Sequence, residues 1–124
     1  ALAHPEVAGM SDRTLVPFAL NDMAQRAAVA SLGAIDEMRT RVAEVVAERT
    51  RVARELRTRG WTVPDPQGNF VWLPLGGRSA EVGVELERRG VVTRAFPEVG
   101  VRITVADAAG NDRLIAALAE IAPD

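Results

Sequence analysis

Two runs of β-branched residues near the C-terminal end constrain the fold most, because their spacing favours one structure, a β-hairpin. Residues 91–96 and 101–105 are rich in valine, isoleucine and threonine, and Pro97-Glu98-Val99-Gly100 separates them. Proline and glycine between two such runs are typical of a short hairpin loop. The sequence therefore predicts two antiparallel strands joined by residues 97–100.

Each predicted strand of this hairpin carries one arginine, Arg94 in the first and Arg102 in the second. An arginine inside a strand needs water or an anion, and its planar guanidinium can bind a carboxylate or phosphate through two parallel hydrogen bonds. Both residues are candidate anion ligands, and the alternative is that they lie on a solvated sheet face. A four-residue loop would place them on opposite faces, whereas a one-residue bulge at Gly100 would bring them to the same face.

The composition is that of one globular domain of 124 residues, with 48% hydrophobic and 26% charged residues. A net charge of -2 and an aromatic content of 4% argue against nucleic-acid binding, which needs a basic face and stacking rings. No apolar run approaches the roughly 20 residues of a membrane span. Without cysteine, and with His4 as the one histidine, the sequence offers no thiolate or histidine-cluster metal site, and it is compatible with the cytosol.

The residue types needed for covalent catalysis are scarce. All fifteen basic residues are arginine, so no side chain of this polypeptide can form a Schiff base. Ser11, Ser31 and Ser79 have no evident partner base, and Gly76-Gly77-Arg78 lacks the spacing and the lysine of a phosphate-binding loop. By elimination, the sequence predicts binding rather than bond making.

Apolar periodicity predicts one long helix and three shorter ones. In residues 36–59, apolar side chains recur at three- and four-residue steps, and the helix would be about 36 Å long, more than a domain of this size needs for itself. The shorter helices and their N-caps are residues 22–32 with Asp22 and Gln25 as a reciprocal cap, residues 79–89 with Ser79, and a last helix up to residue 121 with Asp107 or Asn111. Residues 1–19 are expected to form a loop or one short helical turn.

Two further strands are predicted between the helices, at residues 61–63 and 69–75. In the second of these strands, Phe70 and Trp72 fall on one face and Val71 and Leu73 on the other, so we expect both faces to be covered. The predicted fold class is therefore α+β, a small sheet of about four strands with helices packed on it, including one long helix.

Several short motifs follow one another along nearly the whole chain. They are His4-Pro5-Glu6-Val7, Pro17-Phe18, Met23-Ala24-Gln25-Arg26-Ala27-Ala28 with Leu32, Gly68-Asn69-Phe70-Val71, Gly90-Val91-Val92-Thr93-Arg94, Val101-Arg102-Ile103-Thr104-Val105, and the helix from Asn111 to Leu118. In order and spacing they resemble the small C-terminal domain of fold-type I, pyridoxal-phosphate-dependent aminotransferases. The resemblance is greatest to the histidinol-phosphate and aromatic amino acid aminotransferase branch.

The resemblance implies a role for each arginine of the hairpin. Arg102 matches the arginine that grips the substrate carboxylate, or the substrate phosphate in histidinol-phosphate enzymes. Arg94 matches a second arginine near the anionic end of the substrate. Residues 20–124 would be the small domain, and residues 1–19 an N-terminal segment or interdomain linker.

The resemblance also implies partners that this sequence does not contain. The cofactor lysine, the carboxylate that contacts the pyridine nitrogen and the phosphate cup belong to the large domain of the family. The whole enzyme would be a cytoplasmic homodimer that uses pyridoxal 5'-phosphate, an amino acid or histidinol phosphate, and a 2-oxo acid. The 124-residue chain alone is expected to be an inactive fragment that holds no cofactor, and its start without methionine is consistent with a fragment.

Two positions depart from the family pattern. Ala106 stands where the family usually has glycine, and Pro64-Asp65-Pro66 replaces the serine often found before Asn-Phe-Val. Neither change removes a candidate ligand. Two other interpretations stay open, namely a stand-alone α+β regulatory module that binds a small acidic metabolite, and a structural interaction domain that uses the long helix.

Overall fold

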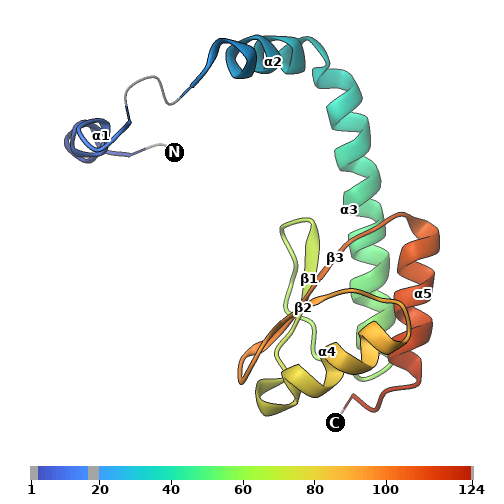
Figure 1. Ribbon diagram of the computed structural model, residues 1–124. Helices are drawn as coiled ribbons and strands as arrows, with labels where there is room; N and C mark the ends of the chain where they lie inside the picture. The colour runs from blue at the N-terminus through green and yellow to red at the C-terminus, as the bar shows by residue number, and fades with distance from the viewer. Residues whose placement is uncertain (1–2, 17–19, 124) are drawn as a thin grey trace. The chain divides into compact units, whose positions relative to one another are not determined.

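The computed structural model describes residues 3–16 and 20–123, and its helices and small antiparallel sheet confirm the α+β class (Figure 1). In chain order the elements are α1 (Pro5–Asp12), α2 (Asp22–Gly33), α3 (Ile35–Thr58), β1 (Phe70–Leu73), the 3-10 turn η1 (Gly76–Arg78), α4 (Ser79–Arg88), β2 (Arg94–Phe96), β3 (Gly100–Thr104) and α5 (Ala108–Ala119). The chain divides into two compact units, Ala1–Met38 and Arg39–Asp124. The predicted domain boundary at residue 20 stays a prediction.

The unit Ala1–Met38 contains α1 and α2, and none of its described residues is buried. The expectation of a loop or a single turn before residue 19 was wrong for α1, which has eight residues. Pro5 lies in the first turn of α1, where a backbone N–H has no partner within the helix, so its absence in proline costs no hydrogen bond, and the fixed φ of proline suits a helix. The cap of α2 is Asn21 rather than Asp22, because the Asn21 side chain accepts a hydrogen bond from the Ala24 N–H at 2.8 Å.

The unit Arg39–Asp124 is built on a sheet of three strands in the order β1-β3-β2, with both pairs antiparallel. The expected fourth strand at residues 61–63 was wrong, because this segment is not a strand and lies outside the sheet that the described residues form. Trp61 and Val63 are nevertheless buried, so their apolar character reflects the core and not a strand. The Arg57 guanidinium donates a hydrogen bond to the Val63 carbonyl at 2.9 Å. This side chain thus gives the backbone carbonyl the donor that a neighbouring strand would otherwise provide.

The core lies between one face of this sheet and helices α3, α4 and α5. On β1, and on β3 from Val101 onward, the buried residues alternate with less buried ones, as expected when one face of a sheet packs on helices. Figure 1 shows α5 running beside the C-terminal part of α3. The buried apolar residues of the strands are Val71, Leu73, Val101 and Ile103, and those of the helices include Val52, Leu56, Val82, Leu86, Leu114 and Leu118.

A polar cluster joins α3 to the start of α5. The buried Asn111 side chain donates to the Glu48 carboxylate and to the Ala106 carbonyl, both at 2.8 Å, and accepts from the Ala106 N–H at 2.9 Å. Arg51 forms ion pairs with Glu48 at 2.7 Å and with Asp112 at 2.8 Å. The cluster therefore holds the chain where it leaves β3.

The helix caps differ in part from those predicted. Asp107 is the N-cap of α5, and its side chain accepts from the Gly110 N–H at 2.8 Å. Ser79 does not cap α4, because its hydroxyl donates instead to the Gly76 carbonyl of the preceding turn, and Ser79 is the first residue of the helix. The buried Ser79 thereby closes η1 against α4 and finds the partner that a buried hydroxyl needs.

Candidate anion-binding site

The hairpin loop has three residues, and this length decides where the two arginines lie. Phe96 pairs with Gly100 and Arg94 pairs with Arg102, so the register expected from a four-residue loop was wrong. The Val99 N–H donates to the Phe96 carbonyl at 3.0 Å, and Glu98 has a φ of 62°, as the third residue of a type II turn requires. Directly paired residues of antiparallel strands point to the same face, so Arg94 and Arg102 share one face.

The face that carries the arginines is the one turned away from the core. Arg102 also pairs with Trp72 of β1, while its neighbours Val101 and Ile103 are buried on the opposite face. Phe70 and Phe96 lie on the arginine side as well, since strand residues two apart share a face. Here Phe70, Trp72 and Phe96 are half-buried, so the expectation that both faces of β1 are covered does not hold within this unit.

Each guanidinium lies over an aromatic ring. The Arg94 Cζ is 5.0 Å from the centroid of Phe96, and the Arg102 Cζ is 5.7 Å from the centroid of Phe70. Both separations fall within the about 6 Å range of cation–π attraction. Phe70 was part of a quoted motif and Phe96 ended a predicted strand, but neither was predicted to support an arginine.

The electrostatics of this face are those of two uncompensated positive charges. Within residues 3–16 and 20–123, neither Arg94 nor Arg102 forms an ion pair or a hydrogen bond with a carboxylate. Arg94 is exposed and Arg102 is half-buried, so both heads reach a surface that a ligand or another protein segment can cover. Such a site can bind a carboxylate or a phosphate by charge-assisted hydrogen bonds.

A glycine allows the aromatic part of this face to pack closely. A Cβ atom at Gly100 would lie 2.3 Å from Cζ2 and 2.7 Å from Cε2 of Trp72. The indole therefore lies directly on the Gly100 backbone. Trp72 also contacts Phe96, with ring centroids 5.8 Å apart and a tilt of 58°.

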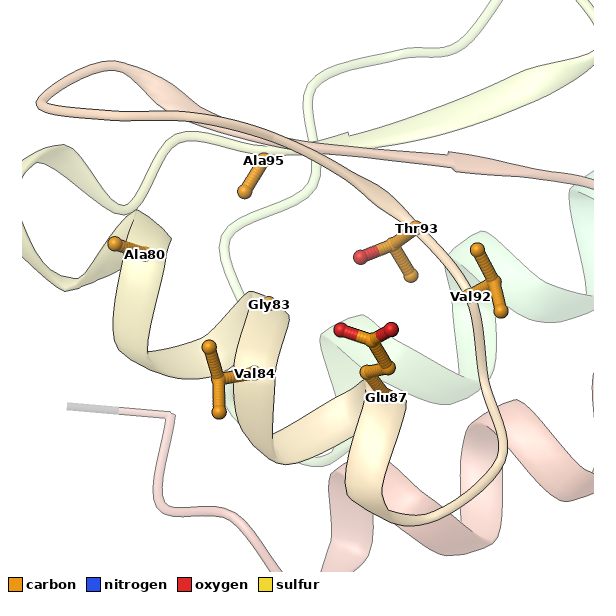
Figure 2. Close-up of a pocket in the computed structure, with 7 residues that line it drawn as sticks. All are labelled: Ala80, Gly83, Val84, Glu87, Val92, Thr93 and Ala95. Carbon is orange, nitrogen blue, oxygen red and sulfur yellow. The ribbon is translucent and has the colours of Figure 1, made fainter.

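The hollow drawn in Figure 2 lies on the other face of the sheet and does not include the arginines. Its volume is about 320 Å³, and it lies between α4 and the chain entering β2. Thr93 and Ala95 line it together with Gly83, Val84 and Glu87, and Figure 2 shows Ala95 facing α4. This pocket therefore does not belong to the face that carries the two arginines.

The carboxylates with shifted pKa values lie away from this face. The hydrogen bonds from Arg51 and Asn111 hold the pKa of Glu48 below its ordinary value, and those from Arg89 and Arg88 do the same for Glu85. Both groups sit in helix-borne ion pairs rather than beside the arginines of the hairpin. In the described part of the chain, no group of three or more histidine, cysteine, aspartate or glutamate residues could hold a metal ion.

Comparison with known proteins identifies the family to which these elements belong. Residues 1–120 match the model of the family described as "Aminotransferase class I and II". The chain belongs to this aminotransferase family. The resemblance inferred from the sequence motifs is thereby confirmed.

Relatives of this aminotransferase chain are longer than the chain itself. It is 50% identical over 112 residues to the aromatic amino acid aminotransferase of Streptomyces coelicolor, and this match covers 90% of this chain and 31% of that protein. It is 44% identical over 115 residues to the aromatic amino acid aminotransferase of Mycobacterium tuberculosis, covering 93% and 33%. The chain therefore spans about a third of the length of the curated relatives it matches.

A solved structure shows the same fold. A Burkholderia pseudomallei protein assigned to the aminotransferases superposes with a TM-score of 0.79 and 26% sequence identity, over 94% of this chain and 37% of that one. Among the residues that the structure of this chain describes, no helix has the length and apolar character needed to span a membrane.

Proposed function

We propose that this chain is the small C-terminal domain of a pyridoxal-phosphate-dependent aminotransferase, in which Arg102, assisted by Arg94, binds the carboxylate or phosphate of the amino substrate. The observation that carries the proposal is the pairing of these two arginines on one accessible sheet face without a carboxylate partner among the described residues. Two such charges disfavour each other unless an anion joins them.

The amino donor that we propose is an aromatic amino acid, with histidinol phosphate as the related alternative. The support is that relatives at 50% and 44% identity are named aromatic amino acid aminotransferases. A 2-oxo acid would be the second substrate, and its carboxylate would meet the same guanidinium. We further propose a cytoplasmic homodimer for the whole protein.

This chain does not contain the group that anchors the cofactor of the family. Formation of a Schiff base requires a primary amine, and the sequence has no lysine. The cofactor would therefore be held by the missing two-thirds of the protein, where it would act as the electron sink for transamination. The contribution of this chain is to bind and orient the anionic end of the substrate, and the chain alone would be inactive.

Exposed apolar surface supports a large partner domain. Along α3, Val42 and Val46 of the unit Arg39–Asp124 form a short apolar stripe one turn apart, with 50% and 40% of their surface exposed. Such a stripe is typical of a surface that another part of the protein covers. We propose that the large cofactor-binding domain of the same polypeptide packs here.

The test of the proposal is Arg102→Ala in the full-length protein that carries this chain. Charge-assisted hydrogen bonds contribute roughly 1.5–3 kcal/mol each, so the loss of even one of them should lower kcat/KM by about 10- to 150-fold, and the loss of the bidentate pair should lower it further, while the cofactor absorbance is unchanged. Arg102→Lys should recover only part of the loss, because a lysine cannot form the bidentate pair.

The matched control is Arg113→Ala, which removes an exposed arginine of α5 that lies outside the hairpin. It should leave kcat/KM unchanged. Wild-type kinetics for Arg102→Ala would refute the proposed role. Saturable binding of an amino acid to the 124-residue chain alone, measured by calorimetry, would favour the stand-alone regulatory module instead.

A further inference from the structure

The two arginines of the anion-binding face present an electrostatic problem when no substrate is bound. They are directly opposite each other on neighbouring strands, where Cα atoms lie roughly 4.5–5.5 Å apart, and like charges in this position repel. In the described ranges no carboxylate compensates either charge. Something other than an ion pair must therefore hold the two heads in place.

The aromatic rings supply that restraint, and they act in opposite directions along the sheet. Phe96 lies at the hairpin end, where it pairs with Gly100, and the Arg94 head is over its ring. Phe70 pairs with Thr104 at the far end of β3, and the Arg102 head is over that ring. Each ring thus draws its guanidinium away from the other one.

Both rings are themselves seated on fixed neighbours. A Cβ at Gly68 would lie 2.8 Å from Cε1 of Phe70, so this ring rests on the Gly68 backbone. Phe96 packs against Trp72, which in turn lies on Gly100. Both rings therefore pack against other atoms of the sheet face as well as against an arginine.

We propose that Phe70 and Phe96 are positioning residues that hold Arg102 and Arg94 ready for an anionic substrate. This inference rests on the proposed function of Arg102. A ring attracts a cation without accepting strong hydrogen bonds, so the N–H donors of the guanidinium stay available. A carboxylate in the same place would occupy those donors and compete with the substrate.

The experiment uses the full-length protein with Phe70→Leu, which keeps an apolar side chain and removes the ring. We expect KM for the anionic amino substrate to rise roughly 2- to 30-fold, the range of a cation–π contact from an exposed to a desolvated site, with kcat and the cofactor absorbance little changed. Phe70→Tyr keeps a ring and should restore KM. Phe96→Leu should act in the same way through Arg94.

Two further measurements separate positioning from a general structural effect. In an Arg102→Ala background, Phe70→Leu should cause no additional rise in KM, because the ring acts only through that guanidinium. Fluorinated phenylalanine at position 70 keeps the side-chain shape while weakening the negative face of the ring, so KM should rise with the number of fluorines even if Phe70→Leu does not fold.

The control is Val99→Ala, which trims an exposed apolar side chain of the hairpin loop and should leave KM unchanged. An unchanged KM in both Phe70→Leu and the fluorinated series would overturn the positioning role, as would equal effects with and without Arg102. If Arg102→Ala lowers kcat/KM in the same experiments, the proposed function stands although the inference about the rings has failed.

Discussion

A methyl group added at Gly100 has no room on the arginine-bearing face of the sheet. In Gly100→Ala the new Cβ would lie 2.3 Å from Cζ2 of Trp72 and 2.5 Å from the backbone oxygen of Leu73. The indole could rotate away, but the Leu73 carbonyl belongs to β1, whose pairing with Val101 holds the sheet together. The substitution must therefore displace both a ring and a strand.

The expected cost follows from this geometry. Inserting a methylene-sized group into a well-packed region costs typically about 1–3 kcal/mol, and an obstructing backbone atom places this case in the upper part of that range. We expect Gly100→Ala to lower the free energy of unfolding by about 2–3 kcal/mol. With a urea m-value of roughly 2 kcal/mol per molar, the unfolding midpoint should fall by about 1 M or more.

The assay is urea unfolding of the 124-residue chain, followed by far-ultraviolet circular dichroism and by tryptophan fluorescence. Gly33→Ala is the matched control, because nothing lies within 4 Å of a Cβ at that helical position, and its midpoint should be equal to or slightly above that of the wild type. A wild-type midpoint together with an unchanged emission spectrum for Gly100→Ala would refute the inference that Trp72 lies on Gly100.

Two further predictions concern the polar cluster between α3 and α5. Asn111→Ala should lower the free energy of unfolding by about 2–3 kcal/mol in urea titrations, because it leaves the Ala106 N–H and carbonyl without their side-chain partner. Asp107→Ala removes only the N-cap of α5 and should lower the free energy of unfolding by about 1 kcal/mol. The pKa of Glu48 is lowered in the folded chain, so the carboxylate stabilises the fold above the ordinary pKa of 4.5, and this contribution is lost as the pH falls through the folded pKa. Glu48→Gln should therefore reduce the difference between the urea midpoints measured at pH 7 and at about pH 3.5. An unchanged difference would contradict this.

Several local signals in the sequence were sufficient for the elements they predicted. The helical spacing from Ile35 to Leu56 predicted a long helix to within one residue at each end, since a sustained apolar stripe leaves little alternative. The β-branched runs on either side of Pro97 predicted the hairpin. Caps were less predictable, because Asn21, Asp22, Asp107 and other short polar residues can each serve.

The segment around Trp61 shows where local signals were not enough. The segment 61–63 has the residue types of a strand, yet none of the strands in the described residues pairs with it. Strand propensity measures how well a side chain suits a half-buried pleated surface. A segment whose side chains are buried in the core outside the sheet favours the same residue types. Only the packed core distinguishes the two.

The sequence by itself determined that this chain is an α+β domain with a hairpin carrying Arg94 and Arg102, because residue type and periodicity act over a few neighbouring positions. The tertiary structure alone decided that the two arginines share a face and that Phe70 and Phe96 lie beneath them. The physical reason is the register of the hairpin. A loop of three residues instead of four shifts the pairing of the two strands by one residue, and this shift places Arg94 and Arg102 on the same face instead of opposite faces.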